Sequence, residues 1–235
     1  MAIKHRILDR EKVLAAARVM VTRDGIRELT FQTLAKELNI RSQSLYNYFS
    51  NLDAVVEALG TEFMHNLHQE LIEQVSGIAG KDAIRTFAQT THRYFEQQQS
   101  LDEIIYFVHH FPESSPFVQA TGDVIGLLKR LITHTEFKHM AKESFVQNFI
   151  SSVLGFTVLE VMGFLPDGQP SRDTTFESLL DLYLGSSSSR VDRSFVKHLG
   201  LNWSRCFYYA AALLLLALNQ TRSRNIRLMK LFQFV

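Results

Sequence analysis

Amide, hydroxyl and guanidinium groups that can read DNA are concentrated in one short segment of the chain. Gln43 and Asn47 lie four residues apart, and each amide can form paired hydrogen bonds with adenine in the major groove. Arg41 can bind guanine through two hydrogen bonds or hold a phosphate, and the hydroxyls of Ser44 and Tyr46 can reach phosphates. These residue types at this spacing indicate contacts with double-stranded DNA.

A short helix is expected just before this polar segment. Thr30 offers a side-chain cap for its first turn, and Leu34, Ala35 and Leu38 recur at the spacing of one buried helix face. Asn39 follows, and asparagine tolerates the left-handed backbone that a tight turn requires. The sequence therefore predicts a helix that ends in a turn at Asn39.

The polar segment is itself predicted to form a second short helix, over residues 42–49. Leu45 and Phe49 lie one turn apart and are expected to face inward, which leaves the polar side chains outside. A longer amphipathic helix is expected upstream, capped by Asp9 and ended by Gly25, with buried positions at Val13, Ala17, Met20 and Val21.

Two short helices joined by a tight turn, the second with a polar outer face, are typical of a helix-turn-helix. The pattern alone leaves one alternative open, which is a solvated helix pair inside an all-helical domain.

A longer pattern spans the chain from Gly25 to Leu59. Its fixed positions are Gly25, Leu29, Thr30, Leu34, Ala35, Leu38, Ile40, Leu45, Tyr46, Tyr48, Phe49, Asn51 and Asp53. In these residues and their spacing the segment resembles the DNA-binding domain of the TetR family of transcriptional repressors. It departs from the family pattern at the turn glycine, replaced by Asn39, at the helix cap, replaced by Arg41, and at a basic residue, replaced by Leu52.

The resemblance implies a role for each polar side chain. It implies that Thr30 and Tyr46 contact the DNA backbone and that Tyr48 anchors against a phosphate. It also implies that five side chains face the major groove: Arg41, Ser42, Gln43, Ser44 and Asn47. The substitution at Leu52 removes one phosphate contact that the family pattern would supply.

Charge divides the chain into three parts, although the whole chain carries a net charge of only +1. Residues 1–50 hold 9 Lys and Arg against 5 Asp and Glu, residues 51–185 hold 8 against 18, and residues 186–235 hold 8 against 1. A basic segment gains affinity for phosphates by releasing counterions. We expect residues 1–50 to be a DNA-binding domain and residues 51–185 to be an effector-binding and dimerisation domain.

The middle part is predicted to be helical throughout, which gives an all-α fold. A long helix from Leu52 to about Gly77 connects it to the DNA-binding head. Further helices are predicted over residues 82–98, 101–111, 117–134, 142–164 and 177–184. The resemblance implies that the last two of these pair two subunits in a four-helix bundle, so we expect a homodimer.

Aromatic residues are frequent in the predicted body, and most of them are expected to be core. The resemblance implies an effector pocket among the body helices, and an apolar small molecule would suit it. Our candidates for its lining are Phe87, Tyr94, Phe107, Phe149 and Phe156.

Enzyme and metal chemistry have little support in the sequence. Glu62 with His65, and Glu136 with His139, match the Glu-x-x-His element of helical di-iron proteins, but two such matches are little more than chance in a chain with nine histidines. No phosphate loop, dinucleotide fingerprint or nucleophile motif accompanies Cys206. We expect no catalytic activity, no metal and no cofactor.

The tail, residues 186–235, carries an apolar run between basic residues that is too short to span a bilayer. An extension from a shifted reading frame, an interfacial membrane anchor and an added packing helix all remain open.

The expected protein is a cytoplasmic, ligand-responsive, dimeric DNA-binding repressor. The alternative is a membrane-surface helical interaction protein that acts through this tail.

Overall fold

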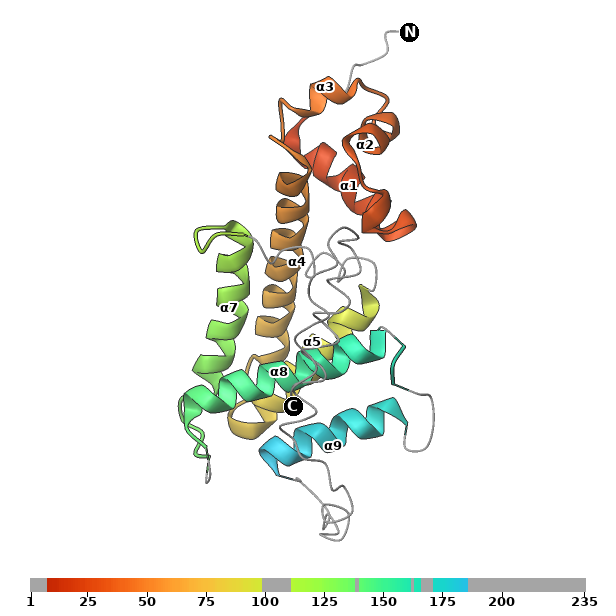
Figure 1. The fold of residues 1–235 in the computed structure, drawn as a ribbon. Coiled ribbons are helices and arrows are strands. Elements are labelled where there is room, and N and C mark those ends of the chain that lie inside the picture. The colour runs from red at the N-terminus through yellow and green to blue at the C-terminus, as the bar shows by residue number, and fades with distance from the viewer. Residues whose placement is uncertain (1–7, 99–110, 138–139, 162, 166–170, 186–235) are drawn as a thin grey trace, which may run out of the picture. The chain divides into compact units, whose positions relative to one another are not determined.

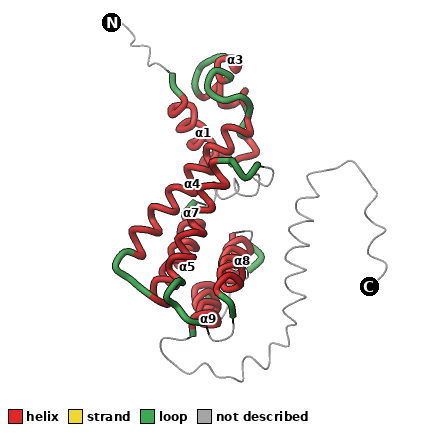
Figure 2. The backbone as a smooth tube through the Cα atoms, turned by 90° about the vertical axis from the view of Figure 1, so that its left-hand side faces the viewer, coloured by secondary structure: helices red, strands yellow, loops and turns green. Residues whose placement is uncertain are grey.

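A computed structural model describes residues 8–98, 111–137, 140–161, 163–165 and 171–185. The described residues between 8 and 185 form one compact unit. Every regular element in the described residues is a helix (Figures 1 and 2), as expected for an all-α fold. The tail and its three interpretations lie outside the described residues.

Three helices build the N-terminal head: α1 (Arg10–Asp24), α2 (Phe31–Glu37) and α3 (Ser42–Leu45). The Asp9 side chain caps α1 by accepting a hydrogen bond from the Lys12 amide at 2.8 Å. Thr30 caps α2 in a reciprocal arrangement with Thr33, each side chain accepting the other's backbone amide. Both predicted caps are confirmed.

The long helix α4 (Leu52–Val75) joins the head to the body, with the limits that its apolar spacing predicts. Its first turns contribute Val55, Val56 and Leu59 to the core of the head. From Phe63 onward its buried side chains belong to the core of the body. One helix therefore takes part in both cores.

The body contains α5 (Gly80–Gln97), α7 (Pro116–Leu131), α8 (Lys142–Val161) and α9 (Arg172–Leu184). Helices α5 and α7 both pack against α4, while α8 and α9 pack against α5 and against each other (Figure 1). Aromatic side chains fill much of this core, for example Phe145 and Phe149. The helix predicted over residues 101–111 lies almost wholly outside the described residues.

Several predicted boundaries differ from the structure, among them the end of the helix predicted over residues 142–164, which is Val161, and two differ by four residues or more. The α-helix predicted over residues 42–49 ends at Leu45, because the Asn47 and Tyr48 amides donate to carbonyls three residues back, and only the Phe49 amide again donates four residues back, to Leu45. The last helix begins at Arg172 rather than Glu177, because the Ser171 hydroxyl accepts the Thr174 amide and starts the helix earlier.

Candidate nucleic-acid interface

The recognition helix, which we define as α3 with the turn to Tyr48, is anchored by its apolar side. Leu45 is fully buried and Phe49 is buried in the core of the head, as predicted. The Arg10 guanidinium lies over the Phe49 ring, 4.6 Å from its centre. These contacts fix the direction in which the polar side of the helix points.

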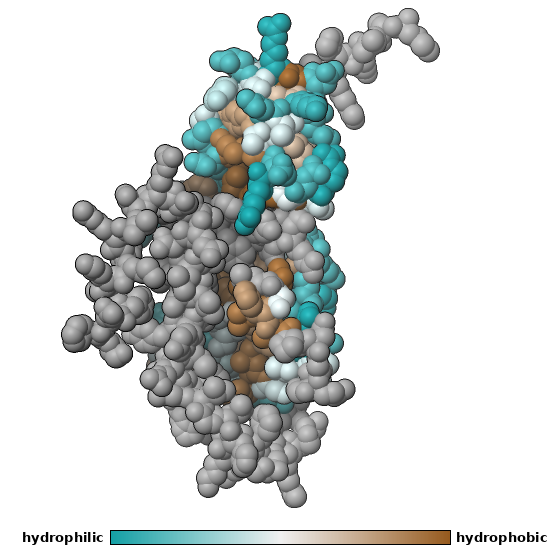
Figure 3. Space-filling view, turned by 45° about the vertical axis from the view of Figure 1, so that its right-hand side comes forward, coloured by the Kyte–Doolittle hydropathy of each residue, from teal (hydrophilic) through white to brown (hydrophobic). Residues whose placement is uncertain are grey.

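The polar side chains predicted to meet bases lie on the surface. Gln43, Asn47 and Arg41 are exposed, and Ser42 and Ser44 are partly exposed. No carboxylate of the described residues lies within ion-pair distance of Arg41. In Figure 3, hydrophilic side chains cover most of the visible surface of the head.

The turn before the recognition helix has the predicted left-handed residue. Asn39 has φ of 54° and is the non-glycine residue with positive φ in the described part of the chain. The Asn39 amide donates to the Lys36 carbonyl at 3.1 Å, and the Ile40 amide donates to the Ala35 carbonyl at 2.9 Å. Asparagine therefore serves here in place of the family's glycine.

The tyrosines of the recognition helix have different surroundings. Tyr46 has 56% of its surface exposed, and its ring meets Phe31 edge-on with centres 4.9 Å apart. Tyr48 is half-buried, and its hydroxyl donates to the Leu8 carbonyl at 2.9 Å. Tyr48 thus ties the start of α1 to the recognition helix, and its phosphate contact remains a prediction.

Charged pairs join the end of α1 to the end of α2 in the head. Arg23 bonds Asp24 and Glu37, with its Nη2 atom 2.8 Å and 3.0 Å from their oxygens. The hydrogen bond from Arg23 lowers the pKa of Asp24, and the same bond raises the pKa of Arg23. Hydrogen bonds from Lys12 likewise lower the pKa of Asp9.

Polar contacts link α4 to both halves of the molecule. Arg18 of α1 forms an ion pair with Glu62. The hydroxyl of Ser115, which caps α7, donates to Glu57 Oε1 at 2.5 Å. A movement of α7 would therefore also displace α4, because the Ser115 contact joins α7 to the part of α4 nearest the head.

The candidate pocket residues lie in the core of the body. Phe87, Tyr94 and Phe149 are buried, and Phe156 is partly buried against them. The Tyr94 hydroxyl donates to the Phe63 carbonyl at 3.2 Å. Burial, with the nearby charges of Glu70 and Glu62, raises the pKa of Tyr94 to about 12.

The fifth candidate, Phe107, lies outside the described residues, so the pocket as a whole remains a prediction. The two pairs weighed for metal chemistry are also only partly described. Glu62 pairs with Arg18 and His65 is exposed. Glu136 lies 3.8 Å from Lys142, and His139 is outside the described residues.

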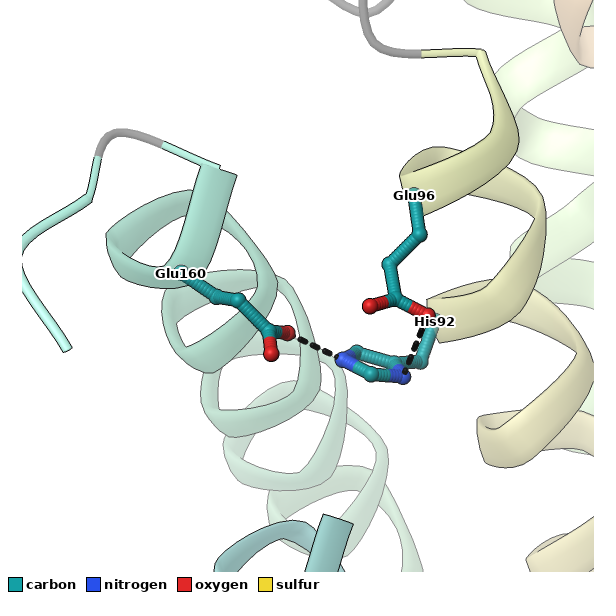
Figure 4. A group of neighbouring side chains, drawn as sticks. All are labelled: His92, Glu96 and Glu160. Atoms are coloured by element: carbon teal, nitrogen blue, oxygen red, sulfur yellow. Dashed lines mark hydrogen bonds and ion pairs between the residues drawn. The ribbon is translucent and has the colours of Figure 1, made fainter. Parts of the chain in front are cut away.

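A charged cluster that the sequence did not reveal lies inside the body (Figure 4). His92 of α5 bonds Glu160 of α8, with its Nε2 atom 2.5 Å from Oε2, and both side chains are buried. Glu96, one turn after His92 on α5, lies on the other side of the imidazole. The spacing of His92 and Glu96 was a usable signal, but Glu160 is 68 residues away from His92 in sequence.

Helices α8 and α9 each carry small or apolar side chains that are exposed. Ser151 and Gly155 on α8 are exposed, and Leu182 on α9 has 60% of its surface exposed. The Tyr183 hydroxyl lies 2.6 Å from Ser152 Oγ and holds the two helices together. Within the described residues α8 is long and apolar enough to cross a membrane by length and composition alone, but its inward side carries the paired Glu160.

Comparison with known proteins shows what the head and the fold are similar to. Residues 13–59 match the family described as bacterial regulatory proteins, tetR family. A curated protein of Haemophilus influenzae, described as an uncharacterized HTH-type transcriptional regulator, is 24% identical over 132 residues, which are 56% of this chain and 59% of the relative. The chain thus matches less than two thirds of that relative's length.

Two solved structures share the fold over most of the described chain. A protein of unknown function from a Rhodococcus species has a TM-score of 0.67 at 20% identity, covering 78% of this chain and 97% of that one. A TetR family transcriptional regulator from Thermus thermophilus has a TM-score of 0.55 at 16% identity, covering 76% of this chain and 100% of that one. The fold likeness therefore extends from the head into the body.

Proposed function

We propose that this chain, whose residues 13–59 match the tetR family of bacterial regulatory proteins, is a dimeric transcriptional repressor in the cytoplasm that a small apolar effector releases from its operator. The observation that carries the proposal is the recognition helix. Leu45 and Phe49 seat it in the core, and Gln43 and Asn47 are exposed on its outer side. An amide side chain in the major groove discriminates adenine through two hydrogen bonds.

Dimerisation follows from what one recognition helix can read. A single helix-turn-helix covers about half of a site, and a two-fold dimer spaces two such helices by about one DNA turn, roughly 34 Å. The exposure of Ser151 and Gly155 on α8 and of Leu182 on α9 supports α8 and α9 as the paired helices. Small residues on a helix let a second helix approach closely, and Leu182 supplies apolar area to bury.

We propose that the effector acts through α4, because this helix takes part in the core of the head and in the core of the body. A ligand between α4, α5, α7 and α8 would favour one packing of the body and so change the tilt of α4. The head moves with α4 because Val55, Val56 and Leu59 belong to its core. Both recognition helices must meet the DNA at one fixed spacing, so a small change in tilt lowers the affinity for the operator.

The proposal is tested by selecting DNA fragments with the purified full chain and measuring binding to the best one. Neutralising phosphates makes the logarithm of the affinity fall linearly with that of the salt concentration. We expect a clearly negative slope between low and physiological salt. A slope near zero would contradict the DNA-binding role.

The effector is tested by linkage, which requires no knowledge of the regulated genes. Apolar compounds that raise the unfolding temperature of the free protein are titrated with and without operator. A typical coupling free energy of about 1–3 kcal/mol predicts a roughly 5- to 150-fold weaker affinity in the presence of operator. Compounds that bind equally well in both titrations would remove the sensor role and leave the DNA-binding role intact.

A further inference from the structure

We propose that His92, Glu96 and Glu160 form a binding site for one first-row divalent metal ion in the body. The ion lies between His92 Nδ1 and the Glu96 carboxylate, and Glu160 positions the imidazole from its other side. The site goes beyond the proposed function, and its test needs no DNA. It departs from the expectation drawn from the sequence that the chain holds no metal.

The distances on the two sides of the imidazole differ in a way that suits an ion. Nε2 of His92 lies 2.5 Å from Glu160 Oε2, which is a direct hydrogen bond. Nδ1 lies 3.7 Å from Glu96 Oε2, which is too long for one. Two ligands about 2.1 Å from one ion are about 3.4 Å apart in tetrahedral geometry and wider at larger angles. The longer distance therefore matches two ligands of a shared ion.

The position of the imidazole between two carboxylates leads to the same site. Nε2 of His92 faces Glu160, and Nδ1 faces the oxygen of Glu96 (Figure 4). A histidine that donates one nitrogen to a carboxylate and binds metal with the other is a recurrent arrangement, in which the carboxylate fixes the ring and strengthens the ligand.

The local charge favours a cation. The formal charges of Glu96 and Glu160 sum to −2, and Arg172 pairs with Glu160 through Nη1, 4.0 Å from Oε1. Arg172 meets the oxygen of Glu160 that does not contact His92, so it leaves Oε2 directed at the imidazole. The two carboxylates and Arg172 together carry a formal charge of −1, which a divalent ion would change to +1.

The surroundings hold the imidazole in place and leave the ion accessible. The ring of His92 stacks on the ring of Phe176 with centres 4.2 Å apart. The ring of Phe156 is tilted relative to His92, and the centres of these two rings are 5.8 Å apart. Glu96 has 42% of its side-chain surface exposed, so an ion can arrive from solvent and complete its coordination with water. Imidazole with carboxylate ligands suits zinc, nickel, cobalt, iron and manganese ions.

The site is tested with the chelator-treated full chain and Zn²⁺ by calorimetry, and with Co²⁺ by visible absorption. We expect one ion per chain at a site that His92→Gln and Glu96→Gln each abolish. Glu160→Gln keeps a hydrogen-bond acceptor but loses the charge, and we expect it to weaken binding by about 10- to 100-fold. We also expect the visible absorption of bound Co²⁺ to differ between Glu160→Gln and the wild type. Such a difference reports a change at the ion itself, which a purely structural role of Glu160 would not produce.

The controls separate this site from other histidines and from misfolding. Glu73→Gln removes an exposed helical carboxylate elsewhere on the chain and should leave Zn²⁺ binding unchanged. Glu96→Gln is expected to fold because Glu96 is substantially exposed, and circular dichroism checks it. The proposal is overturned if the wild type binds no Zn²⁺ or Co²⁺, or if His92→Gln and Glu96→Gln both bind as much ion as the wild type.

Discussion

The cores of the head and the body are built from different side chains. The buried core of the head contains apolar residues such as Val13, Leu34 and Leu45. The described body also buries polar and charged groups, among them His92 and Glu160. The polar groups proposed to meet DNA lie on the surface of the head, whereas the body holds polar side chains inside its core. Surface chemistry on a rigid core suits the recognition of a large partner, and buried chemistry suits a small one.

Removing core volume from the body is expected to have the largest effect. Phe149 is fully buried and its ring stacks on Phe145 with centres 5.2 Å apart. Phe149→Ala should lower the free energy of unfolding by about 3–5 kcal/mol, because it removes apolar contacts and leaves a cavity. Urea unfolding measures this, with Ile72→Ala at an exposed site as the control. Equal effects of the two variants would contradict the assignment of Phe149 to the core.

Blocking the exposed face of α8 is expected to separate the subunits. A Cβ atom added at Gly155 meets nothing within 4 Å in its own chain, so Gly155→Arg should leave the subunit folded. It should give a monomer in sedimentation and weaken operator binding by about a hundredfold, because the two half-sites no longer bind together.

Gly122→Arg is the matched control for this variant. Gly122 is an exposed glycine on α7, and a Cβ atom there also meets nothing within 4 Å. It should remain dimeric and bind the operator normally. A Gly155→Arg protein that is still dimeric would place the interface elsewhere.

The turn of the head is expected to show a moderate effect that depends on backbone conformation alone. Asn39 has φ of 54°, where a side chain branched at Cβ is strained. Asn39→Val should lower the free energy of unfolding by about 1–2 kcal/mol, and Asn39→Gly should restore or exceed the stability of the wild type. Thermal unfolding separates the two variants, and a neutral Asn39→Val would argue against the left-handed turn.

The smallest effect is expected from Tyr94 and appears only at high pH. The pKa of Tyr94 is raised to about 12 in the folded chain, whereas an unfolded tyrosine ionises near about 10. Between these values the unfolded chain has released the proton and the folded chain has not, so stability falls as the pH rises. Urea midpoints between about pH 9 and 12 should fall less steeply for Tyr94→Phe than for the wild type.

Tyr46→Phe provides the control for this pH dependence, because it removes an exposed tyrosine hydroxyl and leaves Tyr94 in place. Its midpoints should fall as steeply as those of the wild type. An unchanged slope in Tyr94→Phe would show that Tyr94 does not retain its proton in this range.

The comparison also explains what the sequence could and could not predict. Caps at Asp9 and Thr30, the turn at Asn39 and the limits of α4 depend on neighbours a few residues away, so local pattern was sufficient. The end of α3 was missed because the apolar spacing of Leu45 and Phe49 shows which side chains turn inward and not which backbone bonds lie between them. The Asn47 and Tyr48 amides donate to carbonyls three residues back, although the Phe49 amide still donates to Leu45.

The chemistry of the body was missed for a different reason. His92 meets Glu160 across 68 residues, and Arg85 meets Glu177 across 92 residues, with 2.6 Å between Nη1 and Oε2. Contacts of this separation depend on how helices pack, and periodicity within one helix carries no information on the partner. The metal site could be inferred only once α5 and α8 had been placed together.

The central claim is that Gln43 and Asn47 read bases, and operator selection with alanine variants tests it most directly. Each variant should lose about 1–3 kcal/mol of binding free energy on the best operator at fixed salt and relax base preference at one position per half-site. Tyr46→Phe, which removes only a hydroxyl expected to meet the DNA backbone, should leave the selected sequence unchanged. If Gln43→Ala and Asn47→Ala both keep the wild-type affinity and the wild-type selected sequence, the recognition helix has been assigned wrongly.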